Sequence, residues 1–267
     1  MFRGCSVLPS FDSDLGSLTE GNWMFYDCSA LTSFTSNLSS LTYGNYMFSN
    51  CYNLTTFTSV SDDSPVNLSS LSEGKHMFSN CDKLTSFASD LSSLTEGGSM
   101  FSNCSSLTSF TSILGSLEEG GYMFSNCTSL KKFTSDLKNL TSGACMFQHC
   151  YSLKDFTSNL SSLSYGGFMF QGCKLNTNSV KNIIDTIKTY EDTSVKSITI
   201  GIDIYDDEQK SNFAEEVGYD SWDALSNAFS ANGWSVTWQF NGAESVATYD
   251  LRGRSVTPRK IYTKLIE

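Results

Sequence analysis

The chain has little of what most catalytic sites are built from. Its 267 residues include two histidines, His76 and His149, and neither has a paired serine, cysteine or carboxylate at a recognisable spacing. No Cys-x-x-Cys pair occurs, and no phosphate-binding glycine motif leads from a strand into a helix. Because these groups are scarce, the sequence argues against a catalytic triad and a zinc site, and we expect neither an enzyme nor a cofactor.

Long apolar runs and an excess of basic charge are also missing. No apolar run is long enough to span a bilayer, and residues 1–20 do not have the pattern of a signal peptide. Seventeen Lys and Arg residues face 28 Asp and Glu residues, which gives a net charge of −11. Since such a surface repels phosphate groups, we expect no nucleic-acid partner and no insertion into a membrane.

What the chain has instead is a repeat. The motif Met-Phe-x-x-Cys occurs eight times, and successive copies lie 23 residues apart except for one interval of 30. A fixed spacing of this length is the signature of a solenoid, in which each unit buries its apolar face only by stacking on its neighbours. The copies begin at Met1, Met24, Met47, Met77, Met100, Met123, Met146 and Met169.

Within one repeat, apolar residues stand 0, 1, 4, 7, 10, 14 and 17 residues after the Met. This spacing can be read as a helical stripe, but the positions between are mostly Ser, Thr, Asn and Gly, each of which costs about 0.5–1 kcal/mol relative to Ala in a helix. The Thr- and Phe-rich runs at 31–36 and 107–112 suit a short strand instead. The sequence therefore predicts an α/β solenoid with one short parallel β-strand per 23-residue repeat.

Glycine and cysteine each form a column in this register. A Gly stands three residues before each following Met, where we expect a turn with positive φ. Eight of the nine cysteines share one apolar column, which favours a ladder of buried thiols over disulfides. Cys145 lies off that column and is expected to be a partly exposed thiol. The glycines are Gly21, Gly44, Gly74, Gly97, Gly120, Gly143 and Gly166.

The combination MF-x-x-C-x-x-L-x-x-F, with a Gly before the next MF, resembles the BspA-like leucine-rich repeats of bacterial and protozoan surface proteins, which also occur in gut bacteria and their phages. The resemblance covers residues 1–173. It implies an adhesion or host-interaction module that binds a protein or a glycan on a cell surface, and an extracellular, cell-surface or virion-associated location. Many relatives have an aliphatic residue and Pro at the end of the strand, where this chain has Thr-Ser-Asn or Thr-Ser-Asp.

Three parts are predicted along the chain. The leucine-rich repeats span 1–173 and carry a seven-residue insertion at 60–66, which is either a binding loop or a tolerated one. Residues 174–243 form a helix-strand-helix-strand cap, and 244–267 a basic tail or linker that ends in a strand at 261–266. In the cap we expect a helix whose N-cap is Thr177 or Asn178, a strand at 197–202, one or two helices in 207–232 and a strand at 235–240. We expect Trp222, Trp234 and Trp238 to lie in the packing of this part.

No corresponding cap precedes Met1, because Met1-Phe2-x-x-Cys5 is already in phase with the other copies. The first rung is therefore expected to be open. Either further sequence precedes it, or this end associates with a second copy of the chain, which would protect the exposed sheet edge. The alternative to a recognition module is therefore a structural spacer or assembly element, for example of a surface or phage-tail assembly, with contacts at the open first rung and the basic tail.

Two columns of polar and aromatic residues are candidate binding surfaces. One lies immediately before each Met, and its rings either bind a ligand or cover the turns. The other lies on and after the strands, where hydroxyls, amides and carboxylates either bind a ligand or satisfy strand and turn preferences. The first column contains Trp23, Tyr46, His76, Tyr122 and Phe168; the second contains Thr35, Thr58, Thr111, Thr134 and Thr157 with Asn37, Asn67, Asp90, Asp136 and Asn159.

The thiol ladder gives a direct prediction. A thiol reagent should label at most one or two cysteines of the folded protein and all nine after denaturation. Counting the labelled sites by mass spectrometry tests this, and extensive labelling of the native protein would contradict a buried ladder.

Overall fold

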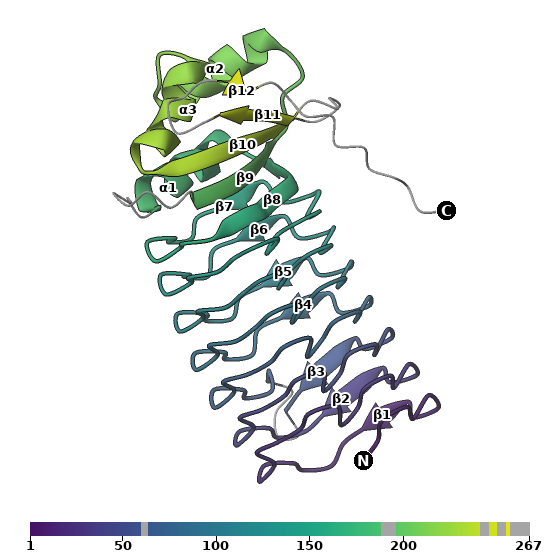
Figure 1. Cartoon of the computed structure of the whole chain (residues 1–267). Helices are drawn as coiled ribbons and strands as arrows, with labels where there is room; N and C mark the ends of the chain where they lie inside the picture. Colours follow the sequence, from purple (N-terminus) through teal and green to yellow (C-terminus); the bar gives the residue numbers. More distant parts are fainter. Residues whose placement is uncertain (60–63, 188–195, 241–245, 250–254, 257–267) are drawn as a thin grey trace.

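A computed structural model describes residues 1–59, 64–187 and 196–240, together with the backbone of 246–249 and 255–256. The chain forms an elongated stack of rungs, one per repeat, with an α/β unit at the end far from the N-terminus (Figure 1). Each of the first seven rungs contributes one short strand, as predicted. These strands are β1 (Ser10–Phe11), β2 (Ser33–Thr35), β3 (Thr56–Thr58), β4 (Ser86–Phe87), β5 (Ser109–Phe110), β6 (Lys132–Phe133) and β7 (Asp155–Phe156).

The strands pair in parallel and in register. Phe11 pairs with Phe34 and Phe34 with Phe57, so the same column of the repeat meets itself in every rung. The strands fall into three groups, β1-β2-β3, β4-β5 and β6-β7, because β3 is not paired with β4, nor β5 with β6, in the described chain. A second ladder of single parallel bridges, which we did not predict, links Glu20, Tyr43, Glu73, Glu96, Glu119, Ser142 and Tyr165.

The predicted apolar columns form the core. From the second rung onward the Phe, Cys and Leu columns are fully or almost fully buried. In the column after Met, the rings stack from rung to rung, as Phe25 does on Phe48 at 5.3 Å and 2°. The strand phenylalanines meet these rings edge to face, as Phe57 meets Phe48 at 80°. Both arrangements suit the charge distribution of aromatic rings, so the ladder adds specific packing to the burial.

The cysteine ladder is confirmed. Each thiol from the second rung on donates a hydrogen bond to the carbonyl of a Phe in the preceding rung, for example Cys104 to Phe78 at 3.1 Å. Burial raises the pKa of Cys104 to about 12, which keeps the thiol protonated. The expectation for Cys145 was wrong, because its side chain is 6% exposed; Cys5, in the first rung, is the partly exposed member.

The predicted role of the glycine column was also wrong. None of the seven glycines has positive φ. They are glycines because there is no room for a side chain: a Cβ on Gly21 would lie 2.7 Å from the Met47 sulfur, and one on Gly97 would lie 3.1 Å from Leu117 and 3.2 Å from Met123. A methionine therefore fills the space at six of these glycines, and Leu163 and Ile198 lie against the seventh, Gly166.

Positive φ occurs instead at two other positions in every turn. One is the residue before Met, as in Tyr46 with φ 59°, and the other is the third residue after Met, as in Asn50 with φ 64°. Each is the third residue of a turn closed by a backbone hydrogen bond, from Met47 to Gly44 in the first case and from Cys51 to Phe48 in the second. This is the position at which a type II turn requires a left-handed residue.

The C-terminal part has the predicted order of elements. Strand β8 (Gly166–Leu175) begins a sheet in which β9 (Lys196–Ile202) and β10 (Trp234–Phe240) follow in parallel, and β11 (Val246–Tyr249) and β12 (Ser255–Val256) follow antiparallel. The helices are α1 (Thr177–Thr186), α2 (Asp207–Val217) and α3 (Trp222–Ala231). Helix α1 begins one residue earlier than predicted, because the Asn176 side chain, rather than Thr177 or Asn178, caps it by accepting from Ser179 N.

Helix α1 lies against the last short strand, β7. Three polar side chains on one face of the helix bond to the backbone there: Ser179 Oγ accepts from Phe156 N, Asn182 donates to the Ser158 carbonyl, and Thr186 Oγ1 accepts from Leu160 N. These backbone groups would otherwise face a further rung. Helix α1 thus supplies hydrogen-bond partners for part of the backbone edge at the end of the repeats.

The predicted tryptophan packing is confirmed. Trp234 and Trp238 are fully buried, and the ring of Trp222 lies 4.7 Å from that of Trp238. The Trp238 indole donates to Ser226 Oγ at 3.1 Å, so its polar group is satisfied inside the core.

Two predicted features lie outside the described residues, namely positions 60–63 of the insertion and the strand at 261–266. Among the residues that are described, no helix has the length and apolar character needed to cross a bilayer.

Two substitutions in one rung distinguish the glycine position, where a side chain has no room, from the position with positive φ. Gly97→Ala should lower the free energy of unfolding by about 1–3 kcal/mol, because its Cβ crowds Leu117 and Met123. Ser99→Gly, at a left-handed position with φ 56°, should leave stability unchanged or raise it. Urea midpoints measure both effects, and the reverse pattern would show that the glycine column supplies the left-handed turn.

Candidate functional site

The column before each Met projects from the stack at a left-handed backbone position. Its five ring-bearing members are Trp23, Tyr46, His76, Tyr122 and Phe168, with φ between 56° and 63°. We call these five residues the aromatic face. A left-handed conformation costs a residue with a side chain roughly 1–2 kcal/mol, and Gly or Asn is the usual occupant. The backbone conformation alone therefore does not explain why aromatic residues occupy these positions.

In the first rungs these rings stack on one another. The Trp23 and Tyr46 rings lie 3.9 Å apart at 7°, and those of Tyr46 and His76 lie 4.5 Å apart at 10°. The guanidinium of Arg3 covers the outer side of Trp23 at 5.0 Å. Partial burial lowers the pKa of His76, which keeps its ring neutral near pH 7. The ring faces here are covered by one another, and edges and hydroxyls remain for a partner.

In the later rungs the rings are separate. Tyr122 and Phe168 are each 49% exposed, and among the described residues no other ring stacks on them. Between them lies Cys145, whose hydrogen bond with the Tyr122 hydroxyl raises the pKa of that tyrosine. This half of the face presents open ring surfaces to solvent.

Tyr165, which the sequence reasoning did not select, adds to this half. It is 51% exposed and lies against Gly167. Tyr165 belongs to the second bridge ladder, as does the exposed Tyr43. Both tyrosines stand four residues before a Met. This shared position was the signal in the sequence that could have identified a second exposed column beside the first.

The strand-side column does not form one continuous row. Thr35 and Thr58 lie within strands and are half-buried, whereas Thr111, Thr134 and Thr157 are exposed and follow the strand ends. The side-chain oxygens beyond them accept hydrogen bonds from backbone amides two residues ahead, which closes a local turn. The residues that do so are Asn37, Asn67, Asp90, Asp136 and Asn159.

An asparagine ladder at the second left-handed position was missed. Asn80 donates to Asn50 at 2.7 Å, Asn103 to Asn80 at 2.7 Å, and Asn126 to Asn103 at 2.9 Å. Asparagine tolerates the left-handed region, so it suits this backbone, and the amides bond to each other along the stack. The sequence signal was an Asn three residues after Met in four successive repeats.

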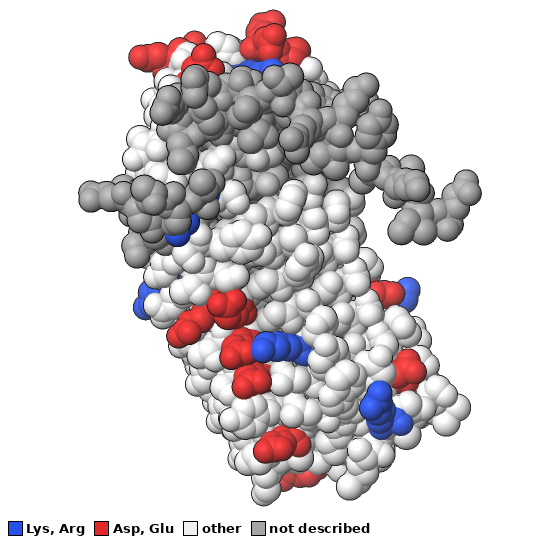
Figure 2. Space-filling view, in the orientation of Figure 1, with Lys and Arg blue, Asp and Glu red and all other residues white. Residues whose placement is uncertain are grey.

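Charge is sparse on the repeats. Figure 2 shows a mostly uncharged surface on which acidic side chains gather in a few places. Lys75 pairs with Glu96, and Asn45 donates to Glu73 at 3.2 Å. The hydrogen bond to Glu96 raises the pKa of Lys75, and the charges of Glu73 and Glu119 add to the shift. Lys75 thus offsets part of the repulsion between Glu73, Glu96 and Glu119, which follow one another in the second bridge ladder.

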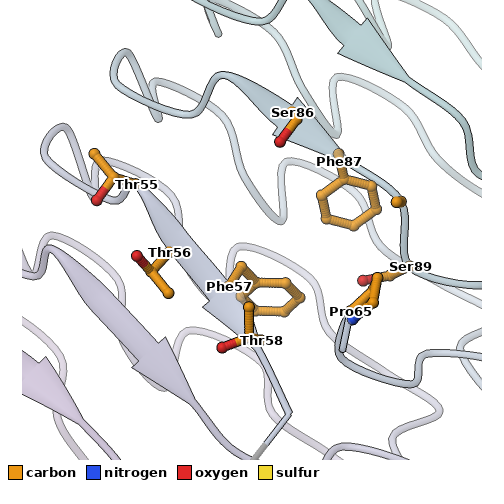
Figure 3. A pocket seen from close by; sticks show the side chains of 9 residues that line it. Thr55, Thr56, Phe57, Thr58, Pro65, Ser86, Phe87 and Ser89 are labelled. Carbon is orange, nitrogen blue, oxygen red and sulfur yellow. The ribbon is translucent and has the colours of Figure 1, made fainter. Parts of the chain in front are cut away.

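A pocket of about 270 Å³ opens between strands β3 and β4 (Figure 3). It lies beside the insertion, where the chain returns to pair Pro65 with Thr58. Phenyl rings, hydroxyls and a proline line it. The lining residues are Thr55, Thr56, Phe57, Thr58, Pro65, Ser86, Phe87, Ala88 and Ser89.

The groups needed for catalysis are not brought together in the described part of the chain. His76 stacks on Tyr46, and the His149 ring shares a hydrogen bond with the Tyr151 hydroxyl at 3.1 Å. No cluster of three or more His, Cys, Asp or Glu side chains there could hold a metal ion. Neither histidine is therefore paired with a nucleophile among the residues that the structure describes.

The fold and these columns define a leucine-rich-repeat protein. The family described as "BspA type Leucine rich repeat region" matches six copies over residues 1–88 and 72–199, and the chain belongs to this family. A crystal structure of a leucine-rich repeat protein from Bacteroides ovatus ATCC 8483 is similar, at 20% identity and a TM-score of 0.33. The match covers 81% of this chain and 56% of that one. No curated protein matches the sequence.

The asparagine ladder can be tested by two substitutions at one site. Asn103→Ala should lower the free energy of unfolding by about 1–3 kcal/mol, since it loses both ladder bonds and places Ala in the left-handed region. Asn103→Gly loses the same bonds without that backbone cost, so its urea midpoint should fall less. A larger loss for Gly than for Ala would contradict this account.

Proposed function

We propose that the chain is a non-catalytic recognition module that binds a protein or a glycan on a cell surface through its repeats. Leucine-rich repeats commonly mediate protein interactions, and BspA-type repeats are typical of surface proteins. The location that goes with this role is extracellular, cell-surface or virion-associated. The rigid stack would hold many weakly binding side chains in one line, so that their contacts act together.

The observation that carries the proposal is the placement of the aromatic face. At the other left-handed position of the turn the chain uses Asn or Asp in five of six non-glycine cases. Before Met it uses rings in five of seven cases, the others being Ser99 and Cys145, although a left-handed residue with a side chain costs roughly 1–2 kcal/mol. Ring stacking offsets this cost at Trp23, Tyr46 and His76, at about 0.5–1.5 kcal/mol per pair.

For Tyr122 and Phe168 no such stacking is present among the described residues, yet both keep half of their surface exposed. Exposed Tyr, Trp and Phe are the residues that most often anchor binding, because they bury a large area at little cost in side-chain entropy. The exposure of Tyr122 and Phe168 therefore supports the proposal that they bind a partner. Because the rings of the first rungs cover each other's faces, a protein partner suits that half better than a sugar ring does.

The C-terminal part has a separate role in this proposal. We assign residues 174–243 as a cap, and the support is that helix α1 bonds to backbone groups of the last short strand through Ser179, Asn182 and Thr186. Solenoids need such an end to remain soluble. Phe168, the member of the aromatic face nearest to the cap in the sequence, is 49% exposed.

The experiment is binding of the purified protein to a combined array of glycans and extracellular proteins, with Tyr46→Ala/Tyr122→Ala alongside. A specific hit should weaken at least 10-fold in this variant, because two members of the aromatic face are removed. The matched control is Tyr52→Ala/Tyr151→Ala, which removes two tyrosines that are 40% and 52% exposed in a different column of the repeat.

The outcomes separate the proposal from its alternative. Loss of the hit in the first variant and its retention in the control support recognition through the aromatic face. Silence from a folded, monodisperse sample would contradict recognition and would favour a structural spacer or assembly element.

A further inference from the structure

We propose that the pocket between β3 and β4 is a binding site for one neutral sugar residue, separate from the aromatic face. The insertion creates the opening. After β3 the chain folds back, so that Thr58 pairs antiparallel with Pro65 and Ser59 N donates to the Ser64 carbonyl at 2.7 Å. Strands β3 and β4 are not paired, and the space between them is the pocket shown in Figure 3.

The lining has the chemistry of a sugar site. Five of the lining residues carry hydroxyls, the others are apolar, and no lining residue carries a charge. The Thr55 hydroxyl already donates to the Thr32 carbonyl at 3.0 Å. A hydroxyl both donates and accepts, so it matches the hydroxyls of a sugar, while Phe57, Phe87 and Pro65 match its C–H surfaces. The five are Thr55, Thr56, Thr58, Ser86 and Ser89.

An anionic ligand fits less well. The pocket supplies no positive side chain, and the chain as a whole has a net charge of −11. The charge therefore selects neutral sugars over sialylated or sulfated ones.

One buried hydroxyl in the pocket lacks a partner. The Thr58 Oγ1 atom is buried and accepts or donates no hydrogen bond. Such a group costs about 1–3 kcal/mol, and native structures seldom leave one without a partner or an ordered water. A ligand hydroxyl next to β3 would supply the missing bond.

The size limits the ligand. The volume of about 270 Å³ lies at the lower end of small-ligand pockets, which are usually about 300–1,000 Å³. This space holds one monosaccharide unit and is too small for a folded peptide segment. The expected ligand is therefore a single neutral sugar, free or as one residue of a glycan.

The test uses the full chain and saturation-transfer NMR with free glucose, galactose, mannose and N-acetylglucosamine. At least one of these should bind at millimolar concentration. Thr58→Val, which keeps the shape of the side chain and removes its hydroxyl, should weaken that binding at least 10-fold.

Ser112→Ala is the matched control, because Ser112 Oγ is also buried without a partner but does not line the pocket. Both variants should unfold at an equal or higher urea concentration than the parent, and only Thr58→Val should lose the sugar. This comparison separates the loss of a site from a change in stability.

Two results would overturn the site. One is no transfer from any of the four sugars, which would mean that the pocket holds water only. The other is equal binding by Thr58→Val and the parent. The Tyr46→Ala/Tyr122→Ala variant should retain sugar binding at the pocket. Failure of this inference is therefore distinguishable from failure of the recognition proposal.

Discussion

Everything in the repeat array depends on the hydrogen bonds that the turn before each Cys makes with the next rung. Alternate amides of one turn, those of Gly44, Tyr46, Phe48 and Asn50, donate to carbonyls of the following rung at 2.8–2.9 Å. Of the amides between them, those of Met47 and Ser49 close turns within the rung, and that of Asn45 donates to the Asn22 side chain of the preceding rung. A chain that turns this tightly can aim every second amide along the stack only if some residues are left-handed, which accounts for the two columns of positive φ.

The side-chain columns follow from that backbone. Since each rung lies directly on the next, identical residues meet, and the columns select for groups that pack or bond with themselves. Phenyl rings stack, thiols donate to carbonyls, and asparagine amides bond in series. The glycine column is the complement of the methionine column, because one provides the space that the other fills. A rung without neighbours would lose all of these contacts, so the array is stable only as a stack.

The sequence was sufficient for the parts of the structure that depend on pattern. The 23-residue period, the buried columns, the thiol ladder and the elements of the C-terminal part were predicted because apolar spacing and helix signals are local. The role of the glycines was predicted wrongly. One sequence does not distinguish a glycine required by a neighbouring side chain, as Gly21 is by Met47, from a glycine required by a turn. The pocket and the bonds from α1 to the last strand were not foreseen, since both depend on where separate segments meet. The aromatic column was identified from its fixed position before each Met, but the distances between its stacked rings were not predicted.

The bonds that join the rungs also fix the backbone position of the aromatic face, where Tyr122 and Phe168 are each 49% exposed. The measurement that tests this most directly is amide hydrogen exchange in the turns of the middle rungs. The account predicts that the amides of Tyr46, Phe48, Phe101 and Asn103 exchange as slowly as those of the β9 and β10 sheet, although they lie in turns. Exchange at the rate of ordinary surface loops would contradict it.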